Sequence, residues 1–300
     1  MPLRIAYFGL PLGAVLLARD GHALASAVIS PGKPAGTWRL ARMGVPVIAA
    51  EAFDAARDDE LFARLAGDPP ELLVSWFWTR RLTPRWLALP QHAALGVHPS
   101  LLPRHRGPDP YFWAIDSGDR ETGVSVHLLE PEYDTGAVLD VERLEVGERT
   151  SWQLARALDR PSLRALRRVV AAYASGTPPP AVPQDETRAT QAPEPTGDLL
   201  RVRWEWPTER VLRRIRALSP VPGLALELFG VRFFVTRARP TGEFARALFP
   251  GEVEIRAEGL VARTGDGALL VERATLDDGA EPPTELGASE LAARFAELHP

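Results

Sequence analysis

A histidine and an aspartate in the segment from Leu95 to Leu139 have the chemistry of a general base and its supporting acidic group. His98 follows the apolar residues Ala94–Val97, and Asp134 begins the sequence Asp134-Thr135-Gly136. A neutral imidazole can take up a proton near physiological pH, and a carboxylate beside it can orient the ring and stabilise the cation that forms. The two residues would suit a reaction in which a substrate loses a proton, if the fold brings them together.

Each of these residues also has a structural interpretation. A single histidine at the end of a strand is usually structural, and Asp-Thr-Gly sequences often cap turns. Arg106, which lies between the two in the sequence, could simply pair with a carboxylate. The residues alone therefore leave the catalytic and the structural interpretations open.

The composition limits the other kinds of site. The 300 residues include no cysteine, so disulfides, thiolate nucleophiles and cysteine metal ligands are excluded. None of the six histidines forms an i, i+4 pair on a plausible helix, so we expect no metal site. The net charge of −4 lacks the overall electrostatic footprint of a nucleic-acid-binding protein, although a local basic patch is compatible with it.

The sequence gives no sign of a membrane protein. The N-terminus lacks the pattern of a signal peptide, and no run of about 20 apolar residues is present. We therefore expect a cytoplasmic protein without a membrane span. The oligomeric state cannot be inferred from the sequence.

The elements that must position His98 and Asp134 alternate between strands and helices in the first half of the chain. Helices are predicted over Leu12–Arg19 and Phe53–Leu65 and near Thr83–Leu89, between short apolar runs. This alternation indicates an α/β, Rossmann-like domain with a mostly parallel sheet and helices on both faces. The predicted strands are Leu3–Phe8, Ala23–Ser30, Val45–Ala49, Glu71–Trp76, Ala94–His98, Val124–Leu129 and Val138–Leu144. Ligands of such sheets bind beyond the carboxyl ends of the strands, which is where His98 is expected.

The second half of the chain follows a different pattern. A helix over Trp152–Tyr173, which Pro161 should break or kink, leads into a proline-rich segment. A helix over Thr208–Leu218 and short strands separated by glycines then predict a small β-barrel. We expect a first domain over residues 1–178, a linker over 179–203 and a second domain over 204–300.

The motifs around His98 and Asp134 resemble those of the formyltransferases that use 10-formyltetrahydrofolate. The family pattern is Asn-x-His-x-Ser-Leu-Leu-Pro, followed by Arg-Gly, Thr-Gly-Val and Asp-Thr-Gly. In this chain the matching residues are, in order, His98, Ser100-Leu101-Leu102-Pro103, Arg106-Gly107, Thr122-Gly123-Val124 and Asp134-Thr135-Gly136. The loop Ser30–Gly36 and the segment Trp206–Gly223 also resemble the family, so the likeness covers most of the chain and implies an OB-like second domain.

The resemblance implies a role for each part of the motif. His98 would be the catalytic base and Asp134 its partner, acting on a tetrahedral intermediate whose oxyanion needs a hydrogen-bond donor. The family places an asparagine at the position of that donor, two residues before the histidine, and this chain has Gly96 there. Glycine has no side-chain donor, so a backbone amide, a water or another residue would have to serve.

The resemblance also suggests which residues bind the two substrates. The formyl donor 10-formyltetrahydrofolate would contact the turn Ser100, Leu101, Leu102 and Pro103 and the pocket wall that begins at Trp76 and Phe77. The acceptor amine would lie near Arg106, Gly107, Asp109 and Tyr111. Trp76 and Phe77 also have the character of core residues.

The expected activity is formyl transfer from 10-formyltetrahydrofolate to a primary amine. Methionyl-tRNA is the acceptor that the whole-chain resemblance implies. A small amine such as an amino sugar nucleotide is the first alternative, and water, which would give hydrolysis, is the second. A paralogue that binds folate without turnover is the non-enzymatic alternative, because of Gly96.

Overall fold

The computed structural model describes residues 1–32, 35–280 and 282–298, which form two compact units. The first unit contains residues 1–108, 122–144 and 157–192, and the second contains 109–121, 145–156 and 193–300. The expected boundaries near residues 178 and 203 stay a prediction. Among the described residues, no helix is both long enough and apolar enough to cross a bilayer.

The first unit is built on a seven-stranded sheet in the order β3-β2-β1-β4-β5-β6-β7. The strands from β1 to β5 pair in parallel, and β6 runs antiparallel to β5. This mostly parallel sheet confirms the predicted fold class of the first half. The strands are β1 (Arg4–Gly9), β2 (Ala23–Ile29), β3 (Val47–Ala49), β4 (Leu72–Trp76), β5 (Ala93–His98), β6 (Glu121–Leu128) and β7 (Val138–Glu145).

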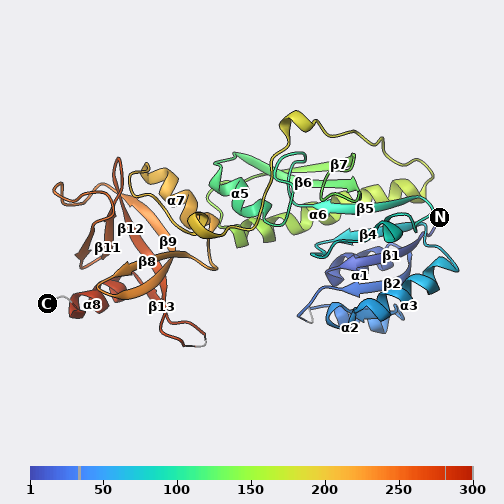
Figure 1. Ribbon diagram of the computed structural model, residues 1–300, viewed down its shortest axis with the longest axis horizontal. Coiled ribbons are helices and arrows are strands. Elements are labelled where there is room, and N and C mark those ends of the chain that lie inside the picture. Colours follow the sequence, from blue (N-terminus) through green and yellow to red (C-terminus); the bar gives the residue numbers. More distant parts are fainter. Residues whose placement is uncertain (33–34, 281, 299–300) are drawn as a thin grey trace. The chain divides into compact units, whose positions relative to one another are not determined.

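Helices accompany this sheet, as Figure 1 shows. The predicted helices correspond to α1 (Pro11–Arg19), α3 (Ala55–Ala66), α4 (Pro84–Leu87) and α6 (Ser151–Ala174). Pro161 does not break α6, which is assigned without interruption on both sides of the proline. The part of α6 in the first unit pairs with β7, because Arg164 and Arg168 both form ion pairs with Glu142.

The core of the first unit is aromatic on one side of the sheet. The ring of Phe8 lies 5.2 Å from that of Trp86 and 5.6 Å from that of Trp78, both in edge-to-face arrangements. Trp76, on the neighbouring strand β4, is fully buried, and its indole N–H donates to the hydroxyl of Ser162 on α6. Burial of these large apolar rings supplies much of the hydrophobic stabilisation of the unit.

The second unit contains an antiparallel sheet in the order β10-β11-β12-β9-β8, with β13 paired to β12. Its strands are β8 (Leu224–Leu228), β9 (Val231–Thr241), β10 (Val253–Arg256), β11 (Gly259–Arg263), β12 (Ala268–Leu276) and β13 (Glu285–Gly287). The helix α7 (Thr208–Ala217) contacts β9, and α8 (Ala288–Leu298) contacts β10 to β13. The short glycine-separated strands thus form the predicted antiparallel β-domain, curled as part of a barrel (Figure 1).

The proline-rich segment is extended, as its composition predicts, but its first half belongs to the first unit. Val182 exchanges backbone hydrogen bonds with Val138 at the start of β7, and Gln191 pairs with Arg106. Short 3-10 turns occur over Glu186–Arg188 and Gly197–Leu200. Residues up to 192 therefore belong to the first unit, paired with the start of β7 and with the loop at Arg106.

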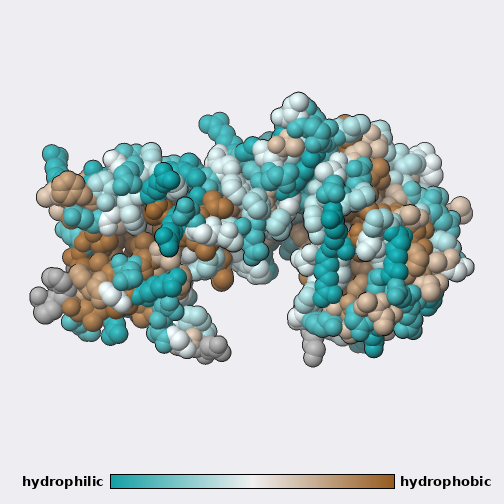
Figure 2. Space-filling model, in the orientation of Figure 1, coloured by the Kyte–Doolittle hydropathy of each residue, from teal (hydrophilic) through white to brown (hydrophobic). Residues whose placement is uncertain are grey.

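Hydrophobic residues appear among hydrophilic ones on the faces of both units shown in Figure 2. Large hydrophobic side chains that are exposed include Trp38, Trp152, Val221 and Phe249. Isolated exposed hydrophobic residues are normal on protein surfaces. Trp38 is considered further below, because it lies between two arginines.

A buried ion-pair cluster joins two helices of the second unit. Asp116, at the end of α5 (Pro110–Asp116), accepts a hydrogen bond from Nε of Arg214 at 2.7 Å and from Nη2 of Arg210 at 2.9 Å. Arg214 is 3% exposed and also donates to the carbonyls of Leu199 and Arg201. Burial raises the pKa of Asp116, but the hydrogen bonds of the two arginines lower it further, so that the net shift is downward.

We predict that Asp116→Ala will destabilise the second unit by about 3–5 kcal/mol, because it leaves the buried guanidinium of Arg214 without its carboxylate. The measurement is urea unfolding followed by tryptophan fluorescence. Glu209→Ala, which removes the exposed ion pair with Arg213 on α7, is the control and should cost at most about 1 kcal/mol. Equal stability of the two variants would contradict this account of the cluster.

The pH dependence of this contribution follows from the lowered pKa of Asp116. Since the folded-state value lies below the unfolded one of about 3.9, the contribution is present above pH 4 and is lost as the pH falls through the folded-state pKa. The difference in stability between wild type and Asp116→Ala should therefore shrink in acid.

Candidate active site

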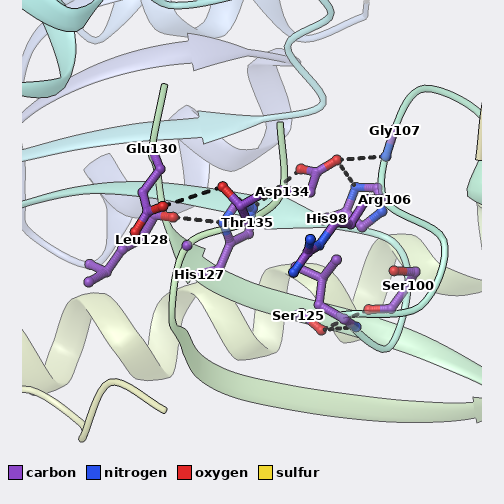
Figure 3. A network of polar contacts seen from close by, with 12 residues as sticks. His98, Ser100, Arg106, Gly107, Ser125, His127, Leu128, Glu130, Asp134 and Thr135 are labelled. Carbon is purple, nitrogen blue, oxygen red and sulfur yellow. Dashed lines mark hydrogen bonds and ion pairs between the residues drawn. The ribbon is translucent and has the colours of Figure 1, made fainter. Parts of the chain in front are cut away.

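The two residues predicted to do chemistry lie together at the end of strand β5, as Figure 3 shows. Nδ1 of His98 is 3.4 Å from Oδ2 of Asp134, and both side chains are largely buried. His98 is the last residue of β5, so it lies at the carboxyl edge where ligands of parallel sheets bind. The fold thus provides the histidine–carboxylate pair on which the sequence analysis relied.

Asp134 is held in an unusual backbone conformation. Its φ angle is 57°, in the left-handed region that few residues other than glycine adopt. Its carboxylate accepts a hydrogen bond from the backbone N–H of Gly107 at 2.9 Å. A conformation of this kind costs of order 1–3 kcal/mol and persists only where the surroundings fix it.

Gly136 lets the Asp134 loop approach strand β6 closely. A Cβ atom on Gly136 would lie 1.9 Å from the carbonyl oxygen of Leu128, so no larger residue fits there. The backbone N–H of Leu128 donates to the carbonyl of Ala137, which holds the end of the loop against β6. This contact explains why glycine ends the Asp-Thr-Gly motif.

Gln184, from the proline-rich segment, fixes the same loop from outside. Its side-chain amide donates to the carbonyl of Asp134 at 2.8 Å and to that of Gly136 at 2.7 Å. Its amide oxygen in turn accepts from Nε and Nη2 of Arg106. The sequence analysis missed Gln184 because it treated the segment as a linker, and no local motif marks this residue.

Arg106 holds the side chain of Gln184 in place and is itself buried. It is 4% exposed and forms an ion pair with Glu186, with Nη2 2.6 Å from Oε1. The hydrogen bonds that Arg106 donates to Glu186 raise the pKa of Arg106, although burial opposes the shift. Its guanidinium therefore braces the Asp134 loop through Gln184, in keeping with the predicted carboxylate pairing.

A second imidazole, that of His127 on β6, also faces Asp134. Its Nε2 is 3.5 Å from Oδ1 of Asp134, while its Nδ1 lies 2.8 Å from the carbonyl oxygen of Leu128. Burial lowers the pKa of His127 to about 4, although Asp134 acts in the opposite direction. At neutral pH the ring is therefore uncharged. The sequence analysis missed this residue, because only the register of β5 and β6 reveals it.

The outer nitrogen of His98 has a partner as well. Nε2 of His98 lies 2.8 Å from the carbonyl oxygen of His105, whose backbone has a φ angle of 60°. The carbonyl of His105 and the carboxylate of Asp134 both only accept, so each contact is a hydrogen bond only while the ring nitrogen that makes it carries a proton. An incoming amine must displace the carbonyl of His105 from Nε2 before this nitrogen can accept a proton from the amine.

The sequence pattern of the formyl transferase family matches residues 16–170, and that of the formyl transferase C-terminal domain matches residues 197–286. Methionyl-tRNA formyltransferase from Anaeromyxobacter dehalogenans is 39% identical over 294 residues, which cover 92% of this chain and 93% of the relative. Methionyl-tRNA formyltransferase from Roseiflexus castenholzii is 33% identical and covers 91% of each chain. The chain belongs to the formyl transferase family.

Solved structures confirm the fold of this formyltransferase. HypX from Aquifex aeolicus in complex with tetrahydrofolic acid has a TM-score of 0.69 at 21% identity, and the match covers 99% of this chain and 48% of HypX. A sugar 3N-formyl transferase, WlaRD, has a TM-score of 0.69 at 11% identity and is covered completely. Both comparisons agree with a Rossmann-like first half and an antiparallel second half. Among the described residues, no cluster of three or more potential metal ligands is found.

The predicted folate-binding turn, Ser100–Pro103, follows His98 in the chain. The buried hydroxyl of Ser100 donates to the carbonyl of Arg104 at 2.6 Å, and the hydroxyl of Ser125 on β6 bridges Ser100 and Leu102. The side chain of Ser100 therefore shapes the turn, and contacts to folate from Leu101, Leu102 and Pro103 stay predictions.

The two aromatic residues assigned to the pocket wall differ in their surroundings. Trp76 is 1% exposed and bonded to Ser162, which places its ring in the core. Phe77, just beyond β4, has a φ angle of 54° and its carbonyl accepts from Ser30. Folate contact by either residue stays a prediction, and Phe77 is the better placed for it.

The residues predicted to contact the acceptor are divided between the units. Arg106 and Gly107 belong to the first unit and touch the Asp134 network, whereas Asp109 and Tyr111 belong to the second. Asp109 caps α5 by accepting from the N–H of Phe112, and burial raises the pKa of Asp109. A role of Asp109 and Tyr111 in acceptor binding stays a prediction.

We predict that Gln184→Ala will lower kcat by about 10- to 100-fold, because small displacements of catalytic groups cost that much in rate. The variant leaves Asp134 in place but frees its backbone carbonyl. Gln191→Ala in the same segment is the control, since Gln191 is exposed and pairs with Arg106 through its backbone. If both variants kept the wild-type kcat, the bracing role of Gln184 would be wrong.

Proposed function

We propose that this formyltransferase moves the formyl group of 10-formyltetrahydrofolate to the amino group of methionyl-tRNA. The observation that carries the proposal is the buried His98–Asp134 pair at the end of β5. Support for the acceptor comes from relatives named methionyl-tRNA formyltransferase, which match this chain over about nine-tenths of its length. The sugar-acting structural relatives are far less similar in sequence.

The donor is supported by the relatives of known structure. HypX is described with tetrahydrofolic acid, and WlaRD with a formylated tetrahydrofolate. The folate supplies the activated formyl carbon, and the protein supplies the groups that move protons and stabilise charge. No metal is required for this chemistry.

In the proposed reaction His98 accepts a proton and Asp134 stabilises the charge that results. The amine nitrogen attacks the formyl carbon, and the resulting ammonium loses a proton to the imidazole–carboxylate pair. The carboxylate of Asp134 stabilises the imidazolium that forms, because opposite charges favour each other in a buried site. The proton then passes to the folate nitrogen as its bond to the formyl carbon breaks. Since formyl-folates and aminoacyl-tRNA occur in the cytoplasm, we place the protein there.

A local cationic surface is available for RNA on helix α2 (Thr37–Arg42). Trp38 is 57% exposed, and the guanidiniums of Arg39 and Arg42 lie 5.3 and 5.7 Å from the centre of its rings. Within the described part of the chain, neither arginine is in an ion pair with a carboxylate. An aromatic ring between two cations suits nucleotide stacking and phosphate binding. Lys33, from the preceding loop, lies outside the described residues.

We predict that the wild-type protein releases tetrahydrofolate and forms formyl-methionyl-tRNA, and that His98→Ala lowers kcat by about 10²–10⁴-fold, the usual effect of losing a general base. The assay compares methionyl-tRNA, deacylated tRNA, an amino sugar nucleotide and no acceptor. His92→Ala, an exposed histidine outside the site, is the matched control and should keep full activity.

The acceptor series distinguishes the alternatives. Transfer to the amino sugar nucleotide but not to methionyl-tRNA would replace the proposed acceptor. Release of tetrahydrofolate without any acceptor would indicate hydrolysis. Folate binding without turnover would indicate a paralogue that has lost the activity.

We also predict that Arg39→Ala/Arg42→Ala raises KM for methionyl-tRNA and makes its dependence on salt shallower, because fewer phosphate contacts release fewer counterions. Activity with a small amine acceptor, if measurable, should be unchanged. Arg57→Ala and Arg64→Ala, on α3, serve as charge-matched controls. An unchanged salt dependence in the α2 variant would exclude this surface from RNA binding.

A further inference from the structure

The space beside Gly96 is filled by the side chain of His127. A Cβ atom added to Gly96 would lie 2.6 Å from Nε2 and 2.8 Å from Cε1 of His127, and 2.7 Å from a methyl group of Leu129. Contacts below 3.0 Å are essentially never made by a real Cβ. Residue 96 must therefore be glycine as long as His127 keeps this position.

The register of the sheet places His127 on the same face as His98. Gly96 and His127 are direct partners across the antiparallel pair β5–β6. Direct partners project to the same face, and so do residues two apart on one strand. The imidazole of His127 consequently stands where a side chain on residue 96 would point, next to His98.

Asp134 connects the two rings. Its Oδ2 atom faces Nδ1 of His98 and its Oδ1 atom faces Nε2 of His127, at 3.4 and 3.5 Å (Figure 3). The other nitrogen of each ring lies against a backbone carbonyl, that of His105 or of Leu128. The three side chains thus form one buried polar cluster.

We propose that His127 is a further catalytic residue, which serves the reaction in place of the carboxamide missing at position 96. This assignment rests on the formyl transfer proposed above. Nε2 of His127 occupies the place of the missing side chain, and in its protonated form it donates a hydrogen bond to the oxyanion.

The proton for this hydrogen bond comes from the reaction itself. In the free protein the neutral His127 ring donates from Nδ1 to the carbonyl of Leu128 at 2.8 Å, the shorter of its two contacts, so that Nε2, 3.5 Å from Oδ1 of Asp134, carries no proton. When the amine nitrogen bonds to the formyl carbon, the carbonyl electron pair moves to oxygen and Nε2 of His98 takes up one amine proton. The proton on Nδ1 of His98 then passes through the carboxylate of Asp134 to Nε2 of His127, which leaves His98 neutral. The new negative charge on oxygen favours the protonated form of His127. As the bond between the formyl carbon and the folate nitrogen breaks, this proton goes to the folate nitrogen and the carbonyl re-forms.

Such a group would stabilise the transition state more than the ground state. Burial keeps the ring neutral before the reaction, so it holds no charge that would repel an ammonium substrate. The charged ring appears only together with the oxyanion, which is the condition for an effect on kcat. A permanently charged residue at this position would lack this property.

The test compares polar and apolar replacements of His127 in the full chain. His127→Leu should lower kcat by about 10²–10³-fold, as loss of one oxyanion donor does elsewhere, with little change in KM for either substrate. His127→Gln keeps a side-chain donor and should retain more activity than His127→Leu at a similar melting temperature. Leu129→Ala, which alters the other neighbour of Gly96, is the matched control and should stay near wild type.

A second comparison exchanges the two positions. Gly96→Asn alone should lower both kcat and the melting temperature, because its Cβ collides with the imidazole. The double variant Gly96→Asn/His127→Ala should have a kcat at least about tenfold above that of His127→Ala. The asparagine carboxamide then has space beside His98 and can donate a hydrogen bond to the oxyanion. The methyl group of Leu129 can rotate away from the new side chain.

The outcomes separate this assignment from the proposed function. A wild-type protein that transfers formyl to no acceptor overturns both. An active wild type whose His127→Leu variant keeps its kcat overturns only the assignment of His127. The assignment also fails if Gly96→Asn/His127→Ala folds and is no more active than His127→Ala.

Discussion

The buried carboxylate of Asp134 is the group on which the arrangement of the site depends. A buried anion requires partners: Asp134 accepts a hydrogen bond from the N–H of Gly107, and ring nitrogens of His98 and His127 lie 3.4 and 3.5 Å from it, where they can donate when they carry a proton. These partners come from three separate segments, which the β5–β6 pairing and the turn after β5 bring together. The left-handed backbone of Asp134 aims the carboxylate between them, and Gln184 holds that backbone from outside.

Much of this fold could be predicted because hydrophobic runs and turn residues are local properties. The strands of the parallel sheet, the helices α1, α3 and α6, and the small antiparallel domain were predicted within a few residues of their bounds. The helices α2, α5 and α8 were missed. Pro110 sits at the first position of α5, and an aspartate caps it, but the aromatic sequence that follows was interpreted only as part of a binding surface. The break predicted at Pro161 is absent, since the apolar face of α6 continues across it and packing outweighs one lost hydrogen bond; a kink there stays a prediction.

Site residues could be predicted only where they belong to a short motif that is contiguous in the sequence. His98 and Asp134 are far apart in the sequence but lie in recognisable motifs, and the structure brings them together. His127 and Gln184 are fixed by strand register and by the path of an extended segment, neither of which a single sequence specifies. Their contributions arise from long-range geometry. For Trp76 the sequence allowed both a core position and a ligand contact; the structure places the ring in the core, bonded to Ser162, and the ligand contact stays a prediction.

Gly96 is better understood together with its cross-strand partner His127 than as the simple loss of the family's asparagine. Decay of an asparagine to glycine would leave an open space beside the catalytic histidine. Here that space holds a buried imidazole, which lies beside the carboxylate of Asp134 and would have to shift to admit even a methyl group on residue 96. Burying an ionisable ring without a function is costly, and a leucine or methionine would fill the same volume without polar atoms. The geometry therefore argues that the donor has moved from one strand to its neighbour, so that position 96 cannot be interpreted apart from position 127.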